Sequence, residues 1–395
     1  MFLNLHDIAE FTEGDNVNMK KIISIVLVLV LIGSFVAACT TPNLPPPPPA
    51  QPAPAPAPQP PSPETAPAPA AQAAPETGEN AADAVEETPA AAAPMMISAA
   101  ELLEIHGNEN VITIGVVSPS AALVPFSNAS NPVRNSFLVW VDDYLGQNPE
   151  ESFYPGDNIY RMPLSHMEDL LSRAGVTEDS LIVVFSSDWL SQGARVAWHL
   201  AMLGLNVRFL DGGVAAWRNL RGAPTGASNR LSGQSVQNNF RAPNYAPASF
   251  SVDVPQVVEA LQNPADWVVI DTRTLSEFNG TSRDSGAYGS GRLRGAVFMD
   301  WEQLFDGGAN DGLLLPEAEL REMFGFIGGR NVIVYCQGGV RSAYVWIVLR
   351  DLGFNAYNFD GSWIHWSWAA SDFSDFPSDV ILELTEEWTD NNGRI

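Results

Sequence analysis

The chain has little cysteine and little positive charge, and each shortage narrows what it can do. Its 395 residues include only two cysteines, Cys39 and Cys336, and 20 basic residues against 46 acidic ones, a net charge of −26. Such a chain repels nucleic acid and anionic lipid, so an anionic substrate needs a local positive site. The five histidines are scattered, and no His, Cys, Asp and Glu cluster has the spacing of metal ligands. We therefore expect no nucleic-acid partner, no metal and no cofactor.

The N-terminus has the order of features that marks an exported protein. A basic start at Met19-Lys20-Lys21 precedes an almost unbroken apolar run, Ile22 to Val36, and two alanines stand directly before Cys39. This order predicts a secretory signal over residues 1–39, with Met19 as a candidate true start. The small residues before Cys39 resemble the lipobox of bacterial lipoproteins, which implies that Cys39 is lipidated. The alternative is an uncleaved anchor helix, because the apolar run approaches spanning length.

Both interpretations of the N-terminus place the protein outside the cytoplasm. The lipoprotein interpretation anchors it on the outer face of a bacterial membrane, in the cell envelope or periplasm. Residues 40–95 are rich in proline and alanine and cannot bury a core, so we expect a disordered linker. Proline-rich chain favours extended polyproline II, and about 50 residues would reach on the order of 150 Å. Residues 97–395 are enough for two domains of ordinary size.

The chain after the linker contains two similar halves, which we place at residues 96–228 and 250–375. Three features recur at one offset: Leu203-Gly204 with Leu352-Gly353, Asp211-Gly212 with Asp360-Gly361, and Trp217 with Trp366. Constant spacing indicates a duplicated domain. Short apolar strands alternate with helical patterns in both halves. This alternation predicts an α/β fold, in which each domain has a mainly parallel sheet flanked by helices.

Cys336 stands where such a fold places chemistry. An apolar run, residues 331–335, ends at the thiol; two glycines come next, and a helical pattern begins near Arg341. The strand, glycine loop and helix N-terminus aim backbone N–H groups at one sulfur and favour the thiolate. If Cys39 is lipidated, Cys336 has no partner for an internal disulfide. A buried cysteine acting as a small hydrophobe is the alternative, and the loop glycines argue against it.

The motifs of the second half resemble those of a catalytic rhodanese domain. They are Val269-Ile-Asp-Thr-Arg273 with Glu277-Phe278, Gly291 to Val297, Cys336-Gln-Gly-Gly-Val-Arg341 and Asp360-Gly-Ser-Trp363. The tandem resembles the two-domain thiosulfate sulfurtransferases over roughly residues 111–368, weakly in the first half. Arg292 and Arg294 depart from the family's usual His and Pro. The resemblance implies that Cys336 takes a sulfane sulfur as a persulfide and passes it to a thiophilic acceptor, such as cyanide or a thiol.

The expected site combines this resemblance with the chemistry of the loop. Cys336 is the nucleophile, and the expected substrate-binding residues are Arg341, Arg273, Gln337, Gly338, Gly339 and Val340. Either arginine could instead form a structural ion pair. We expect Asp271 to order the loop by hydrogen bonding, Trp363 and Trp366 to pack, and His365 to lie on the surface. No separate general base is apparent in the loop, which favours sulfur transfer over hydrolysis.

The first half lacks the catalytic residues. Ser186 or Ser187 stands in place of the thiol and Gly115 in place of Asp271. A serine there has no neighbouring histidine, so a serine hydrolase is a poor interpretation. We expect this half to be structural and to cover the active face of its partner.

Two other functions stay open. Cysteine phosphatases on the same fold need Cys-x5-Arg, whereas Arg341 follows Cys336 after four residues, a loop one residue too short for phosphate. A non-catalytic persulfide carrier or sulfur-binding module needs the same cysteine and is distinguished by turnover. Among donors we favour thiosulfate or another inorganic sulfane over 3-mercaptopyruvate, because an exported enzyme meets such donors outside the cell. The loop combines the small neutral residues typical of mercaptopyruvate users with a basic residue at its end.

Overall fold

The computed structural model describes residues 94–117, 132–140, 162–186, 189–284, 286–307 and 312–369. The expected signal segment, Cys39 and nearly all of the expected linker lie outside these residues, as does the end of the second half, residues 370–375. Of the helices described, none is long and apolar enough to cross a bilayer.

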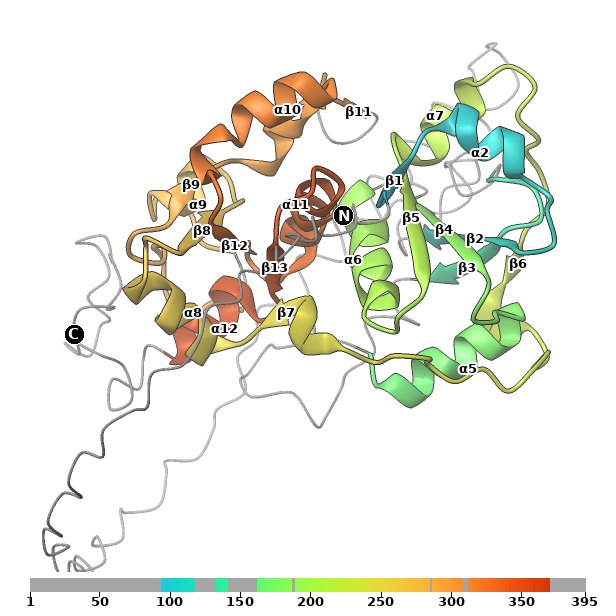
Figure 1. The fold of residues 1–395 in the computed structure, drawn as a ribbon, viewed down its shortest axis with the longest axis horizontal. Helices are drawn as coiled ribbons and strands as arrows, with labels where there is room; N and C mark the ends of the chain where they lie inside the picture. Colours follow the sequence, from blue (N-terminus) through green and yellow to red (C-terminus); the bar gives the residue numbers. More distant parts are fainter. Residues whose placement is uncertain are drawn as a thin grey trace, which may run out of the picture. The chain divides into compact units, whose positions relative to one another are not determined.

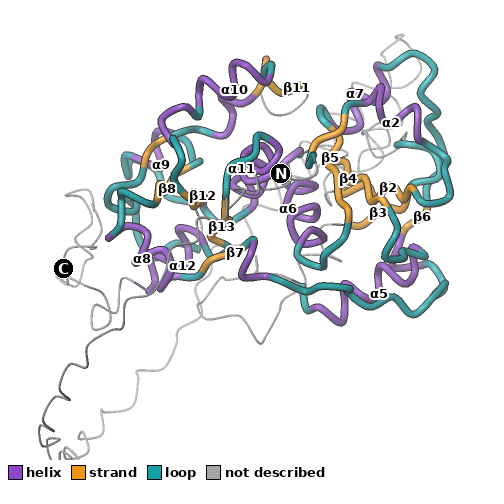
Figure 2. The backbone as a smooth tube through the Cα atoms, viewed as in Figure 1, coloured by secondary structure: helices purple, strands orange, loops and turns teal. Residues whose placement is uncertain are grey.

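The first half is built on a six-stranded parallel sheet with the order β1-β5-β4-β2-β3-β6. Its strands are β1 (Met96–Ile97), β2 (Val111–Val117), β3 (Phe137–Trp140), β4 (Leu181–Ser186), β5 (Asn206–Leu210) and β6 (Asn229–Arg230). Its helices are α2 (Ala99–Ile105), α5 (Leu164–Ala174), α6 (Leu190–Ala201) and α7 (Gly213–Asn219). Residues 231–250 lead on to the second half as loop with two short 3-10 turns, η4 (Leu231–Gly233) and η5 (Pro247–Ser249) (Figure 2).

The second half repeats this topology in a five-stranded parallel sheet with the order β7-β13-β12-β8-β9. Its strands are β7 (Ser251–Val252), β8 (Trp267–Asp271), β9 (Val297–Phe298), β12 (Asn331–Tyr335) and β13 (Ala356–Phe359), and β10 (Phe305–Asp306) pairs antiparallel with β11 (Leu313–Leu314). Its helices are α8 (Val254–Gln262), α9 (Leu275–Phe278), α10 (Glu317–Met323), α11 (Val340–Asp351) and α12 (Ser362–Ala369), with 3-10 turns η6 (Trp301–Leu304) and η7 (Gly325–Ile327). The predicted fold class, parallel sheets flanked by helices, is confirmed.

The residues that suggested a repeat occupy equivalent places in the two sheets. Gly204 and Gly353 come after helices α6 and α11, and both adopt left-handed backbone angles, with φ of +76° and +88°. Trp217 on α7 and Trp366 on α12 are both buried beside their sheets. A left-handed turn requires glycine, and a large buried ring resists replacement, which explains why these positions still match.

Helices α6 and α11 pack against one another at the centre of the described structure (Figure 1). Every residue of α6 is buried except Gln192, and α11 is buried from Ser342 to Leu349. Helices buried to this extent must be covered on almost every side. Each helix obtains it from its own sheet and from the other helix, so the two halves share one apolar core, with Phe209 edge-on to Tyr344 at 5.5 Å.

One buried ion pair crosses this apolar interface. Arg195 of α6 is fully buried and donates from its Nη2 to Oδ1 of Asp360, which comes directly after β13. Its Nη1 donates to the carbonyl oxygen of Gly339 at 3.0 Å, and its guanidinium lies over the ring of Trp198 at 4.8 Å. A buried charge is tolerated only when it is paired and hydrogen-bonded. The first half thus places a cation directly behind the loop that begins at Cys336.

Replacing this cation should destabilise the whole fold. In Arg195→Met we expect the free energy of unfolding to fall by about 3–5 kcal/mol, because Asp360 stays buried without its cation. Urea unfolding of the full chain measures this loss. Arg241→Met is the matched control, because Arg241 is 62% exposed in its ion pair with Glu168 and should cost less than about 1 kcal/mol. Equal losses in the two variants would contradict the inference.

Candidate functional site

Cys336 lies at the carboxyl edge of the second sheet, as the sequence predicts. It comes directly after β12, and the last residue of that strand, Tyr335, pairs with Asp271 at the end of neighbouring β8. Helix α11 begins four residues after the thiol, at Val340. Cys336 is only 1% exposed and is a free thiol. The edge of a parallel sheet where strands end is where this class of fold places its ligands.

The loop after Cys336 has its carbonyl oxygens turned outward and hydrogen-bonded there. The carbonyl oxygens of Cys336 and Gln337 accept from the backbone N–H groups of Trp363 and Ile364 at 3.0 Å each. The carbonyl oxygen of Gly339 accepts from Arg195 and from Nδ2 of Asn358, also at 3.0 Å. With these carbonyl groups engaged outside the loop, the backbone N–H groups of Gly338 and Ser342 hydrogen-bond to Cys336, as in an anion-binding nest.

The sulfur is therefore surrounded by donors and positive charge. Burial raises the pKa of the Cys336 thiol, but the charge of Arg341 and hydrogen bonds from Ser342 and the backbone of Gly338 outweigh it, so that the pKa is lowered. The Ser342 hydroxyl lies 3.5 Å from Sγ. A lowered pKa means that the nucleophilic thiolate forms at lower pH than in a free cysteine.

Arg341 is held beside the sulfur by a carboxylate. Its two terminal nitrogens donate to the two oxygens of Glu277 at 2.8 and 2.7 Å, a bidentate pair. Burial would raise the pKa of Glu277, but Arg341 and the hydrogen bonds from Thr274 lower it to about 2. Thr274 and Glu277 form the capping box of α9, which fixes the carboxylate in place. Arg341 therefore forms the structural ion pair that was the alternative interpretation, and it also lines the pocket as predicted.

Arg273 is not among the described residues that line the pocket; it forms the structural ion pair that the sequence offered as the alternative to substrate contact. Its Nε and Nη2 donate to Asp271 at 2.9 and 2.6 Å, and Nη2 also donates to the carbonyl oxygen of Gly291 at 2.7 Å. It is 2% exposed and lies over the ring of Trp363 at 4.8 Å. Asp271 also accepts a hydrogen bond from the Tyr335 hydroxyl. The Asp-x-Arg motif is therefore a buried structural ion pair that joins β8 to β12 and α12.

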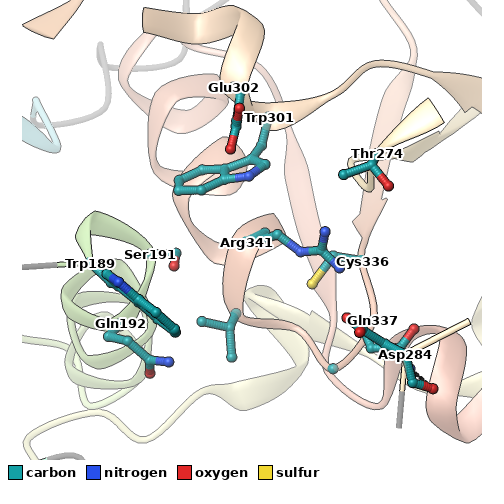
Figure 3. Close-up of a pocket in the computed structure, with 12 residues that line it drawn as sticks. Trp189, Ser191, Gln192, Thr274, Asp284, Trp301, Glu302, Cys336, Gln337 and Arg341 are labelled. Carbon is teal, nitrogen blue, oxygen red and sulfur yellow. Dashed lines mark hydrogen bonds between the residues drawn. The ribbon is translucent and has the colours of Figure 1, made fainter. Parts of the chain in front are cut away.

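A pocket of about 470 Å³ opens onto Cys336 (Figure 3). Of the predicted residues it is lined by Cys336, Gln337, Gly338, Val340 and Arg341. Gly339 does not line it: its φ is +75°, and its Cα faces Arg195 and the carbonyl oxygen of Asp360, with no room for a side chain. Gly339 thus shapes the loop from behind, and its contact with substrate stays a prediction.

Seven further residues line the pocket that sequence reasoning did not select. Trp189, Ser191 and Gln192 come from the start of α6, Trp301 and Glu302 from η6, and Thr274 and Asp284 from the segments after β8. In Figure 3 the sulfur lies between the α6 residues on one side and Gln337 and Asp284 on the other. The Thr274-x-x-Glu277 capping box was a visible signal for one of them. No sequence pattern indicated the other six, which are brought near Cys336 by the packing of the folded chain.

The first half, residues 96–228, contributes one wall of this pocket and contains no cysteine. Ser186, at the end of β4, accepts a hydrogen bond from the N–H of Gly193 at 3.0 Å and donates to the carbonyl oxygen of Leu190 at 3.2 Å. Its hydroxyl is buried in fixing the start of α6; Ser187 lies outside the described residues. His365, expected on the surface, is half-buried, whereas Trp363 and Trp366 pack in the core as predicted.

The low pKa of Cys336 can be measured by alkylation. In a Cys39→Ser background Cys336 is the single thiol, and its rate of reaction with iodoacetamide should rise with pH around a midpoint below that of a free cysteine. Arg341→Gln should move the midpoint to higher pH, because a positive charge that favours the thiolate is lost. Arg321→Gln, which removes a 51% exposed arginine from α10, is the control and should not move it. A midpoint that Arg341→Gln leaves in place would contradict this electrostatic account.

Comparison with known proteins agrees with the geometry. Residues 254–369 match the family model of the rhodanese-like domain. A "Thiosulfate sulfurtransferase" of Corynebacterium glutamicum is 29% identical over 220 residues, 50% of this chain and 67% of that one. "Putative thiosulfate sulfurtransferase SseB" of Mycobacterium tuberculosis is 30% identical over 208 residues, 51% of this chain and 69% of that one.

A solved structure shows the same fold. The Tum1 protein of Saccharomyces cerevisiae superposes with a TM-score of 0.58 at 20% identity, over 70% of this chain and 96% of that one. Three findings point to one family: the two parallel sheets share one topology, a free cysteine stands at the carboxyl edge of the second sheet, and the relatives are sulfurtransferases by name. The chain belongs to the rhodanese family of thiosulfate sulfurtransferases.

Proposed function

We propose that the protein transfers a sulfane sulfur from thiosulfate, or a similar donor, through a Cys336 persulfide to a thiophilic acceptor such as cyanide or a thiol. The observation that carries the proposal is the loop itself. Its carbonyl oxygens are bonded outward, so the donors around Sγ stabilise an anion at that point. Every species in a sulfur transfer carries negative charge there: the thiolate, the donor and the persulfide.

The groups around the sulfur determine the steps. The Cys336 thiolate attacks the outer sulfur of thiosulfate, and the electron pair of the donor's S–S bond leaves with sulfite. The persulfide's terminal sulfur then lies among the groups that line the pocket, with Arg341 and the loop N–H groups offsetting its charge. The acceptor attacks that terminal sulfur, and Cys336 departs as the thiolate. No proton transfer is required at the sulfur, so a separate general base is unnecessary.

Phosphate-ester hydrolysis is the weaker alternative for this loop. A phosphatase loop encircles its phosphate, and its arginine forks onto two phosphate oxygens. Here the fork of Arg341 is occupied by Glu277, and the back of the loop is closed by Arg195 at Gly339. These contacts favour sulfur transfer.

Turnover through Cys336 is the direct test. The full chain mixed with thiosulfate and cyanide should produce thiocyanate, and Cys336→Ser should abolish production, because a serine cannot hold a sulfane sulfur. Mass spectrometry after thiosulfate alone should show one added sulfur atom on Cys336. Loading without turnover would instead support a persulfide carrier. Thiocyanate formation unchanged in Cys336→Ser would overturn the proposal.

The same assay separates the donors. We expect thiosulfate or polysulfide to load Cys336 faster than 3-mercaptopyruvate. Release of phosphate from p-nitrophenyl phosphate should stay at the rate measured without protein. A clear phosphatase turnover that depends on Cys336 would contradict the assignment to sulfur chemistry.

We also propose that the protein is a lipoprotein held outside the cytoplasm through Cys39. Support comes from the basic, apolar and small-residue order before this cysteine. Cells that express the full chain should incorporate labelled palmitate into it, and Cys39→Ala should lose both the label and membrane association. Cys336→Ser is the matched control, because it removes the other cysteine and should keep the label. Membrane association that survives Cys39→Ala would favour an uncleaved anchor helix.

A further inference from the structure

The pocket beside Cys336 changes character between its floor and its mouth. At the floor, Cys336 is 1% exposed and is surrounded by N–H groups and Arg341. Toward solvent stand two carboxylates, Asp284 and Glu302, both on exposed residues. Arg341 is the one basic residue among the described lining residues; it is paired with Glu277, and its charge acts at the sulfur on the floor of the pocket. The mouth of the pocket is therefore more acidic than its floor: a cation is favoured at the mouth, whereas an anion is stabilised at the floor by Arg341 and the loop N–H groups.

Two tryptophans add to this acidic mouth. Trp301 is 9% exposed and is fixed by its backbone N–H, which donates to the carbonyl oxygen of Thr272 at 3.2 Å, and by edge-on packing with Phe305 at 5.5 Å. Trp189, just before α6, is 57% exposed although it is large and apolar. Indole faces attract cations, most strongly where carboxylates stand beside them. Figure 3 shows both rings on the pocket wall, with Glu302 next to Trp301.

The size of the pocket points beyond small inorganic ligands. Its volume of about 470 Å³ falls within the range of about 300–1,000 Å³ that is usual for organic ligands. Cyanide or sulfite would leave most of this space empty. The extra room is bounded by Trp189 and Gln192 of the first half, on the side away from Asp284 (Figure 3).

We propose that the sulfur acceptor is an organic thiol that carries a positive charge, an ammonium or quaternary ammonium group, which sits against Trp189 and Trp301, with Glu302 beside Trp301 and Asp284 across the pocket. This inference rests on the proposed persulfide function and names the acceptor class for the same site. In the step itself, the acceptor thiolate attacks the terminal sulfur of the Cys336 persulfide. A new S–S bond forms on the acceptor, the old S–S bond breaks, and its electron pair returns to Cys336 Sγ. The acceptor leaves as a hydropersulfide, with no net oxidation or reduction.

Three thiols of similar size and different charge test this directly. The full chain, loaded with thiosulfate, is given thiocholine (cationic), 2-mercaptoethanol (neutral) or 3-mercaptopropionate (anionic), and kcat/KM is measured for each. Comparison of each variant with the wild type cancels the intrinsic reactivity of each thiol. In Glu302→Gln and in Trp189→Ala the ratio of thiocholine to 2-mercaptoethanol should fall about 2- to 5-fold. The combined variant should lower it about 5- to 10-fold.

The anionic thiol gives the sign of the effect. Glu302→Gln should raise kcat/KM for 3-mercaptopropionate relative to 2-mercaptoethanol, because a repelling carboxylate is gone. Glu319→Gln changes the net charge equally on the exposed face of α10 and should leave both ratios as they are. The charge effects should also shrink in high salt.

The outcomes separate this inference from the one on which it rests. Thiocyanate formation from cyanide, together with thiol ratios that Glu302→Gln and Trp189→Ala do not change, overturns the cationic acceptor and leaves the sulfurtransferase intact. No product from any acceptor, cyanide included, overturns both. Ratios that shift as strongly in Glu319→Gln show an effect of net charge alone and also overturn the proposed site.

Discussion

A sulfur anion held away from water is the constraint on which the rest of this structure depends. Burial of Cys336 opposes the thiolate, so water must be replaced by fixed donors and charge. The loop achieves this by binding its own carbonyl oxygens elsewhere: to the first turn of α12, to Asn358 and to Arg195. Each of these partners lies in a different element. The reactive loop is therefore hydrogen-bonded to several separate elements of the fold.

The first half, which has no cysteine, also contacts this loop. Its helix α6 covers α11, supplies Arg195 to the back of the loop and places Trp189 at the pocket's edge. Ser186, one of the two serines predicted to stand in place of the thiol, fixes the start of the same helix. The first half thus forms a wall of the pocket and supports the loop of the second half. Residues of both halves therefore line one pocket.

The sequence was sufficient for the fold class and for the central residue of the site. Strand and helix periodicity, the repeat and the Cys336 loop predict the parallel sheets, the position of the thiol and the start of α11. The family resemblance placed Arg273 in the pocket, where the structure has a buried pair with Asp271. A motif shows which residues recur, and it does not show which way a side chain points.

The residues that sequence reasoning missed are those brought in from a distance. Trp189 and Trp301 lie more than 30 residues from Cys336 along the chain, and no local pattern joins them to it. Arg195 lies in a mostly apolar helical pattern, which predicts that the charge has a partner and does not identify that partner as Asp360. Such contacts depend on how two helices pack, which the order of residues alone does not specify.

Gly339 carries a consequence for how this fold can change its chemistry. Its left-handed backbone rests against Arg195 and Asp360, so the short arc from Cys336 to Arg341 is closed from behind by the other half. An inserted residue would have to push the loop into that ion pair or out into the pocket. Lengthening the Cys-x4-Arg loop by one residue, to the length that phosphatases need, would thus require a simultaneous change in helix α6, more than 140 residues upstream. Contact between the halves thus makes the loop's length depend on both of them, so a change in length requires changes in both.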